Sequence, residues 1–195
     1  MVTMIVITIT NMMNDLPNHL GGHMNVNHID LGALQYLHTT FKVKSLLDVG
    51  CGLGEMKNLC DQLNISYMGI DGDWTVWRDH NNIILHDYTK GKSTWTYDHT
   101  YDLAWSTEFV EHVEEKYIDN FMNDIVKCKY ALITHALPRK KGYHHVNCQT
   151  QDYWINIFSK YNFKFDEKTT KIIRAKSSME REFIRENGLF FKKEE

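Results

Sequence analysis

The sequence has little proline, no excess of charge of one sign and no long hydrophobic run. Two prolines in 195 residues exclude a long proline-rich linker. The formal net charge of −3 lacks the basic excess that dedicated nucleic-acid-binding proteins usually carry. No stretch approaches the ~18 consecutive apolar residues of a membrane span. We therefore expect neither a DNA partner nor a transmembrane segment.

Cysteine is also scarce, and its spacing is irregular. The four cysteines, at positions 51, 60, 128 and 148, form no CxxC pair. The first nine residues are apolar, but they lack the basic start and the small-residue cleavage site of a signal peptide. We therefore expect reduced thiols in a cytoplasmic protein.

The sequence does contain enough apolar residues for one well-packed domain. They make up 43% of the chain, and 195 residues is an ordinary length for a single domain. Organised sequence begins at Asp15, so we expect the domain to span residues 15–195. Residues 1–14 form an extension, which is either an added strand or sequence upstream of a later start at Met12 or Met13.

Short apolar runs alternate along the chain with segments of helical periodicity. Met56, Leu59, Cys60 and Leu63, for example, fall at i, i+3, i+4 and i+7, which is one face of a helix. Such alternation is typical of a mainly parallel sheet covered by helices on both faces. The expected strands are residues 45–49, 65–70, 83–85, 101–105, 130–134, 163–165 and 189–191. The expected helices are residues 29–41, 56–63, 74–78, 118–125 and 154–161, with a charged helical stretch before the last strand.

The residues that indicate function follow the first three strands, where a parallel sheet binds its ligands. Asp48-Val-Gly-Cys-Gly-Leu-Gly54 lies between a strand and a helix, and its glycines let the backbone approach a ligand that a Cβ would exclude. The spacing is GxGxG, which differs from the GxGxxG of dinucleotide sites, and no Lys-Ser/Thr pair of a P-loop follows. Asp71 ends the second strand, where a carboxylate can accept two hydrogen bonds from a ribose diol. Asp87 ends the third strand and can accept a hydrogen bond from an adenine amino group.

These motifs together resemble the cofactor-binding signature of class I S-adenosylmethionine-dependent methyltransferases. The resemblance rests on Leu-Asp48-Val-Gly50-Cys-Gly52-Leu-Gly54, followed by Gly69-Ile-Asp71 and His86-Asp87, and it covers residues 15–195. The segments 18–23 and 105–113 also resemble small stand-alone methyltransferases of bacteria and their phages.

The resemblance implies a fold, a cofactor and a set of binding residues. The fold is a three-layer α/β sandwich with a seven-stranded, mainly parallel sheet, helices on both faces and the last strand antiparallel. The cofactor is S-adenosylmethionine, and its product is S-adenosylhomocysteine. In this family the glycine loop cradles the methionine end, the second-strand carboxylate holds the ribose and the third-strand pair reads the adenine. The implied binding residues are Asp48, Gly50, Cys51, Gly52, Gly54, Asp71, Gly72, Asp87 and Tyr88.

Methyl transfer from a sulfonium requires alignment more than acid–base catalysis, because the leaving group is already activated. A general base is needed only when the acceptor must lose a proton early. The candidates are Glu108 and His112, after the fourth strand, and His135, after the fifth. The alternative for Glu111 and His112 is a first-turn carboxylate and a helix-packing imidazole. Trp105 ends the fourth strand and can offer its ring face to the sulfonium as part of the cofactor site.

Histidine is frequent, with 11 residues. His23, His144 and His145 are candidate substrate-binding residues, with a solvated loop as the alternative for the last two. His19, His23 and His28 have no acidic or cysteine partner of matching spacing, so we expect no metal site. We expect instead that this histidine-bearing segment folds over the cofactor.

The acceptor class is inferred mainly from motifs and segments that the sequence lacks. Compact size and the lack of an added substrate domain favour a small molecule, a glycan or a lipid precursor. Residues 105–108 read Trp-Ser-Thr-Glu and lack the Asn/Asp-Pro-Pro-Tyr/Phe signature of amino-group DNA methylation. An RNA or a protein acceptor remains an alternative, as do an aminopropyltransferase and a non-catalytic module that binds the cofactor or a related nucleoside. The oligomeric state is left open.

Overall fold

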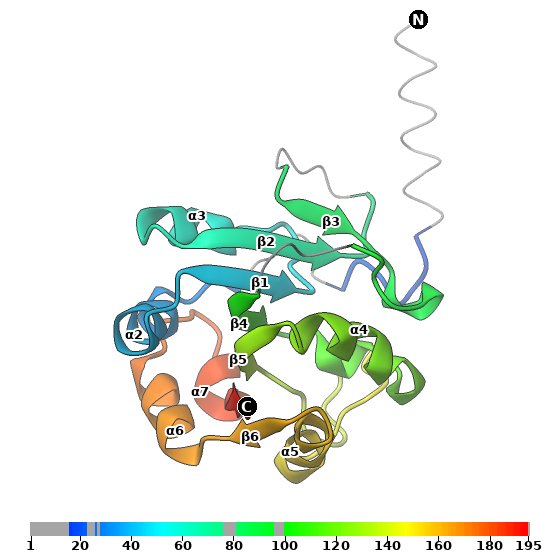
Figure 1. The fold of residues 1–195 in the computed structure, drawn as a ribbon. Coiled ribbons are helices and arrows are strands. Elements are labelled where there is room, and N and C mark those ends of the chain that lie inside the picture. Colours follow the sequence, from blue (N-terminus) through cyan, green and yellow to red (C-terminus); the bar gives the residue numbers. More distant parts are fainter. Residues whose placement is uncertain (1–15, 23–25, 27, 76–80, 96–99, 195) are drawn as a thin grey trace, which may run out of the picture.

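Strands and helices alternate along the computed structural model, which describes residues 16–22, 26, 28–75, 81–95 and 100–194 (Figure 1). The strands are β1 (Ser45–Val49), β2 (Ser66–Asp71), β3 (Ile83–Leu85), β4 (Tyr101–Ser106), β5 (Cys128–Ile133), β6 (Phe163–Phe165) and β7 (Leu189–Lys193). The helices are α2 (Leu31–Phe41), α3 (Met56–Gln62), α4 (Ile118–Ile125), α5 (Gln151–Ser159), α6 (Glu167–Lys176) and α7 (Phe183–Asn187). Three 3-10 helices span Tyr88–Lys90, Val110–His112 and Glu115–Tyr117. The expected extension 1–14 and most of the expected helix 74–78 lie outside the described residues.

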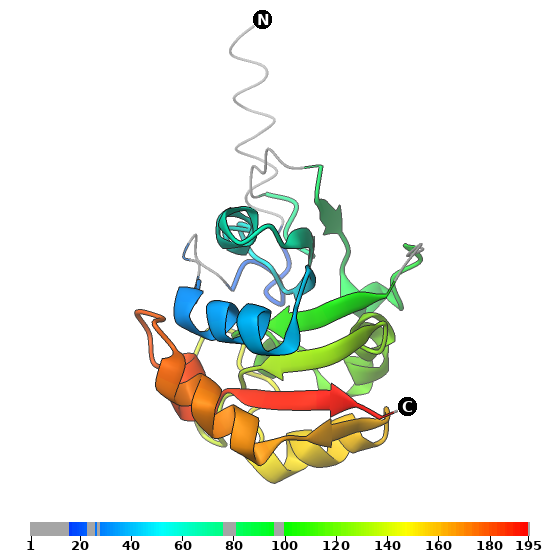
Figure 2. The same ribbon diagram turned by 60° about the vertical axis from the view of Figure 1, so that its left-hand side comes forward.

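The strands form one seven-stranded sheet in the order β3-β2-β1-β4-β5-β7-β6. The first five strands of this order are parallel, whereas β7 runs antiparallel to both of its neighbours. Figure 2 shows β7, in red, between β5 and β6. The predicted sheet, with its antiparallel last strand, is therefore confirmed.

Some observed boundaries differ from the expected ones. The fifth strand begins at Cys128 instead of Tyr130, because Cys128 pairs with Tyr101 at the start of β4. Helix α5 begins at Gln151 instead of Trp154, because the Thr150 side chain caps it. The charged helical stretch expected before β7 forms the two helices α6 and α7.

Helices cover both faces of the sheet and make two hydrophobic cores. On one face, Leu34 and Leu37 of α2 pack with α3, α6 and α7 against the inward side chains of the strands. On the other face, Phe121 of α4 and Phe158 of α5 pack against the opposite set of strand residues. The three layers follow from this division of apolar side chains between the two faces.

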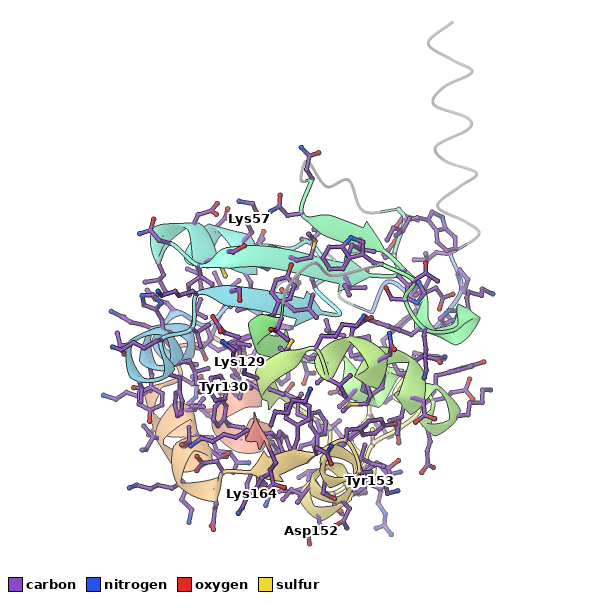
Figure 3. The ribbon with its side chains drawn as sticks, viewed as in Figure 1. Lys57, Lys129, Tyr130, Asp152, Tyr153 and Lys164 are labelled. Atoms are coloured by element: carbon purple, nitrogen blue, oxygen red, sulfur yellow. The ribbon has the colours of Figure 1, made fainter. Side chains whose placement is uncertain are left out.

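The amino and carboxyl edges of the sheet differ in their polar residues. At the amino edge, Asp102 accepts hydrogen bonds from the backbone N–H of Lys44 (2.8 Å) and Ser45 (3.2 Å) and pairs with Lys129 (2.7 Å). Lys129 is labelled at the beginning of β5 in Figure 3. The carboxyl ends of β1, β2, β4 and β5 meet at the other edge, where the motif residues gather. No helix in the described part of the chain is long and apolar enough to cross a bilayer.

Candidate active site

A cavity of about 280 Å³ lies at the carboxyl edge of the sheet. Its walls come from the loops after β1, β2 and β4, from the segment before α2 and from the loop that precedes α5. A smaller cavity of about 40 Å³ adjoins it and shares His19, Leu20, Gly72, Phe109, His112 and Val113. The two cavities therefore form one continuous site over the strand ends.

The glycine loop forms the floor of the larger cavity. Gly50 and Gly52 have φ values of 75° and 52°, a left-handed conformation that glycine adopts without strain. The backbone N–H groups of Gly50 and Cys51 donate to the Ile70 carbonyl at 2.9 and 3.1 Å, which ties the loop to β2. A Cβ at Gly50 would overlap the Phe109 ring. The loop is thus shaped by backbone conformation and by close packing together.

Asp71, the predicted ribose-binding residue, lies beside the glycine loop. One carboxylate oxygen accepts from the Gly52 N–H and the other from the Asp73 N–H, each at 2.8 Å. These bonds hold the carboxylate at the cavity wall, which it lines. Ionised carboxylate oxygens are strong acceptors of hydroxyl hydrogen bonds, which is the chemistry a ribose diol requires.

Asp48 also lines the larger cavity, although its side chain is only 4% exposed. It accepts a hydrogen bond from the Tyr67 hydroxyl at 3.0 Å. Burial raises the pKa of this carboxyl to about 7, the Tyr67 bond lowers it, and the nearby charge of Asp71 adds to the rise. A carboxyl in such a place favours a cationic neighbour, because that charge offsets the cost of burial.

The smaller cavity lies over the end of β3. Asp87 and Tyr88 line it together with His144. The Asp87 carboxylate accepts from the Thr89 N–H at 2.8 Å and lies 3.0 Å from His19 Nε2. The Tyr88 hydroxyl donates to Asp124 at 2.8 Å, which fixes the ring in the core.

The histidine-bearing segment before α2 lines both cavities. His19, Leu20, Gly21 and Gly22 line the larger cavity, and Leu20 lies so close to Gly72 that a Cβ there would overlap it. This contact, together with the His19–Asp87 pair, attaches the segment to the ends of β2 and β3. The candidate substrate residue His23 lies outside the described residues.

A cluster of acidic and imidazole side chains lies at the ends of β4 and β5. We call Glu108, Glu111, His112 and His145 the Glu–His cluster. Glu108 has a φ of 51°, and its N–H donates to Thr134 Oγ1 at 2.8 Å. Such a conformation is costly for a residue with a Cβ, and strained residues of this kind concentrate at functional sites.

Burial dominates the electrostatics of the Glu–His cluster. Glu111 is fully buried, and burial followed by the charge of Glu108 raises its pKa well above the usual range. Burial also raises the pKa of Glu108 and lowers that of His112 to about 4, with His145 contributing to the latter. The His112 imidazole is therefore neutral at physiological pH.

The loop 143–147 is held against this cluster by backbone hydrogen bonds. The Glu111 carbonyl accepts from the N–H groups of Val146 and Asn147, each at 3.0 Å. This anchoring brings His145 into the larger cavity and His144 into the smaller one. The loop was predicted as a substrate-binding or solvated segment, and both of its histidines line the site.

Three residues named from the sequence lie away from the cavities. His135 is 2% exposed, and its Nδ1 lies 3.1 Å from the Gln149 carbonyl. Trp105 is fully buried in the core on the α2 side of the sheet. Gly54 closes the turn into α3, where its N–H donates to the Cys51 carbonyl at 2.8 Å. Among the described residues, none of these three lines either cavity.

The corrections for His135 and Trp105 have one physical cause. Side chains alternate between the two faces along a strand. Leu103 and Trp105 enter one core, whereas Ala104 between them enters the other. Likewise, the Thr134 side chain reaches the Glu108 N–H, and the His135 ring, one residue later, lies against Gln149. A position at a strand end therefore does not by itself direct a side chain into the site.

Comparisons with known proteins agree at the level of the fold. No family model matches the sequence, and no curated protein matches it. The structure of the plantazolicin methyltransferase BpumL with SAH matches with a TM-score of 0.54 at 16% identity, over 84% of this chain and 83% of that chain. The methyltransferase domain of bacterial CtHen1-C matches with a TM-score of 0.54 at 15% identity, over 85% and 97%. Human N-acetylserotonin methyltransferase (ASMT) with SAM matches with a TM-score of 0.55 at 15% identity, over 85% and 50%.

The chain has the class I methyltransferase fold. Within this methyltransferase fold, the site contains several residues that the sequence did not single out. Phe109 lines both cavities and contacts the glycine loop. Met56 and Tyr143 also line the larger cavity. Phe109 could have been found from the sequence, because it follows Glu108 in the motif segment 105–113. Met56 could not, because its spacing indicates only a residue on the buried face of a helix.

The described residues fit S-adenosylmethionine at this site of the methyltransferase fold. Gly50 and Gly72 leave no room for a side chain of their own and open the backbone to a ligand. Asp71 presents carboxylate oxygens for a diol, and the buried Asp48 suits the cationic amino group of a methionine moiety. The smaller cavity beside Asp87 and Tyr88 suits a planar base.

Proposed function

We propose that the protein is an S-adenosylmethionine-dependent methyltransferase and that the two joined cavities hold this cofactor. The observation that carries the proposal is the placement of Asp48 and Asp71 beside the left-handed glycine loop, where both line the same cavity. The named neighbours add support, since BpumL was solved with SAH and ASMT with SAM. We assign the function to one domain of residues 15–195.

Bound S-adenosylmethionine would supply a methyl group that is already activated on a sulfonium. The chain's part is then to bind and orient. Asp71 accepts the ribose hydroxyls, Asp48 balances the amino group, and Asp87 with Tyr88 borders the base. Phe109 packs against Gly50 of the glycine loop. Proximity alone can lower a barrier of this kind by about 7–11 kcal/mol.

The acceptor would enter from the side of the Glu–His cluster. Glu108, His112, Tyr143 and His145 line this part of the larger cavity and offer polar groups to an incoming substrate. We propose a small-molecule, glycan or lipid-precursor acceptor, because these polar side chains line a cavity that suits a compact molecule with hydroxyl or amine groups. An RNA or a protein acceptor, and a binding module without turnover, are the competing possibilities.

The test is calorimetric titration of the full chain with S-adenosylmethionine and, separately, with S-adenosylhomocysteine. We expect micromolar binding of both. Asp71→Ala should weaken binding about 5–150-fold, since hydrogen bonds to a charged acceptor are lost. Asp102→Ala is the matched control, because Asp102 also accepts two backbone N–H groups but lies at the opposite edge of the sheet. Absence of binding in a folded sample would contradict the proposal.

Turnover is tested next by screening acceptors for release of S-adenosylhomocysteine. A small hydroxyl- or amine-bearing compound that is methylated supports the proposed acceptor class. Methylation of RNA or protein alone would replace that class, and cofactor binding without any turnover would favour the binding module.

A further inference from the structure

Three nitrogen or oxygen donors converge at the cavity from two different loops. Glu111, His112 and His145 each place one donor atom within 4.8 Å of the others. The two imidazole centroids lie 5.0 Å apart, with the rings inclined at 80°. Two imidazoles and one carboxylate are a ligand set that divalent transition metals use in enzymes.

Glu111 has a fully buried carboxyl group that faces the carboxyl group of Glu108 and has no cation beside it. Its side chain is 0% exposed, and among the described residues no lysine, arginine or histidine forms an ion pair with it. Two neighbouring carboxyl groups in a buried place are costly unless a positive charge offsets them. His112 Nδ1, on the adjacent residue, is buried without a hydrogen-bond partner. A cation between Glu111 and His112 would satisfy both groups.

His145 has its second ring nitrogen free to coordinate. Its Nδ1 lies 3.0 Å from the Lys140 carbonyl, which can only accept, so Nδ1 carries the hydrogen. The lone pair is therefore on Nε2. Histidine ligands of metals almost always donate their other N–H to a carbonyl or carboxylate in this way.

The site is held in place by the fold before any ion binds. The hydrogen bonds from Val146 and Asn147 to the Glu111 carbonyl fix the loop of His145 to the turn of Glu111 and His112. In addition, the His145 ring packs on Gly142, where a Cβ would overlap it. A preformed donor set loses little freedom when it binds a metal.

We infer that Glu111, His112 and His145 bind one divalent transition-metal ion, which holds a hydroxyl oxygen of the acceptor beside the cofactor cavity. The inference rests on the proposed methyltransferase function for the identity of the reaction, but the ion site stands on the donors alone. It differs from the expectation from the sequence that the chain has no metal site, which considered only His19, His23 and His28.

The ion would select hydroxyl-bearing acceptors. A bound divalent ion lowers the pKa of a coordinated hydroxyl, so the oxygen becomes a nucleophile near neutral pH. Glu108, which lines the cavity next to the ion ligands, accepts the released proton. The acceptor oxygen then bonds to the methyl carbon as the carbon–sulfur bond breaks. The electron pair of the broken carbon–sulfur bond remains on the sulfur of S-adenosylhomocysteine.

The experiment is calorimetric titration of the chelator-treated full chain with Zn²⁺ and with Mn²⁺, each as the chloride salt and without cofactor. We expect one site per chain with micromolar or tighter affinity for at least one ion. Glu111→Gln and His145→Gln should each weaken it at least about tenfold. His144→Gln is the matched control, since it lies in the same loop but outside the donor set, and it should bind as the wild type does.

The same samples are then titrated with S-adenosylhomocysteine in the presence of a chelator. Retained nucleoside binding without metal binding in the wild type would overturn the ion site and leave the proposed function standing. Equal metal affinity in the wild type, Glu111→Gln and His145→Gln would overturn it as well. His145 lies on a partly exposed loop, so its variant keeps the test decisive if the buried Glu111→Gln protein fails to fold.

Discussion

At the carboxyl edge of the sheet, the carboxylates on the β1–β2 side and on the β4–β5 side have different surroundings. On the β1–β2 side, both oxygens of Asp71 accept hydrogen bonds from backbone N–H groups of the neighbouring loops. On the β4–β5 side, the Glu111 carboxyl is fully buried and faces the carboxyl of Glu108, and no cation among the described residues forms an ion pair with it. The first arrangement is complete by itself and presents a fixed wall to a neutral ribose. The second is incomplete, which is what a site for a positively charged ligand requires.

The two sides touch at Gly50, and the largest expected effect lies there. Gly50→Ala places a Cβ on the Phe109 ring and forces alanine into a φ of 75°. We expect a loss of about 4 kcal/mol in the free energy of unfolding, from overpacking and left-handed strain together. S-adenosylhomocysteine binding should fall below detection. Urea unfolding and calorimetry measure the two effects.

Gly91→Ala separates the two causes in the Gly50 prediction. Gly91 also has a positive φ, 131°, but a Cβ there meets nothing within 4 Å. This variant should lose stability through backbone strain alone and bind the nucleoside normally. A Gly50→Ala protein no less stable than Gly91→Ala would show that Phe109 moves aside and that the two sides are not in tight contact.

Asp48 tests whether the contrast between Asp71 and Glu111 depends on their location in the sheet or on the number of their hydrogen-bond partners. It lies on the β1–β2 side, yet it is buried with Tyr67 as its hydroxyl donor, and its pKa is raised to about 7 from an ordinary value of 3.8. The folded state therefore holds a proton that the unfolded chain releases, so stability falls as the pH rises from about 4 to about 7. Asp48→Asn should remove about 3 kcal/mol of this fall. Urea unfolding at pH 5 and pH 8 measures it, and an unchanged pH dependence would contradict it.

Replacing each carboxylate by its amide tests the contrast between Glu111 and Asp71 directly. In the metal-free chain, Glu111→Gln should raise the free energy of unfolding at pH 8 by about 2 kcal/mol, because an unpaired buried carboxylate is costly. Asp71→Asn should lower it by about 2 kcal/mol, because an amide NH₂ cannot accept one of the two backbone N–H groups. The opposite signs are the decisive result in urea unfolding. Two changes of the same sign would break the comparison.

The smallest effect concerns the segment that bridges the two sides. His19 pairs with Asp87 at 3.0 Å, and its ring lies 6.3 Å from that of His144. His19→Ala should weaken S-adenosylhomocysteine binding about twofold to fourfold, since a partly exposed pair contributes under about 1 kcal/mol. His38→Ala is the control, because His38 bonds to the Val43 carbonyl just before β1, at the amino edge of the sheet. A tenfold loss with His19→Ala would mean that the segment contacts the ligand directly.

The sequence predicts the β1–β2 side well because its information is local. The strand, the glycine loop and Asp71 lie within residues 45–71, and the loop conformation follows from the glycines themselves. Asp48, Gly50, Gly52 and Asp71 could all be named without knowing any long-range contact. The seven-stranded sheet with its antiparallel last strand could be expected too, through the resemblance that these residues carry.

The β4–β5 side could not be predicted in the same way, because its arrangement depends on long-range contacts. His145 meets Glu111 and His112 only because two backbone N–H groups of its loop bond to the Glu111 carbonyl. Nothing in the spacing of these residues indicates that contact. Sequence reasoning therefore named Glu108, His112 and His145 as separate candidates and missed that they form a cluster with Glu111.

The place of β7 in the sheet has a consequence for how the chain folds during synthesis. This strand, the last in the sequence, fills an interior position between β5 and β6. Until residues 189–193 leave the ribosome, the edge of β5 has no partner and the Phe190 and Phe191 side chains are missing from the two cores. Unpaired edges and exposed apolar surface promote aggregation, so the nascent chain passes through its most vulnerable state just before completion of the sheet.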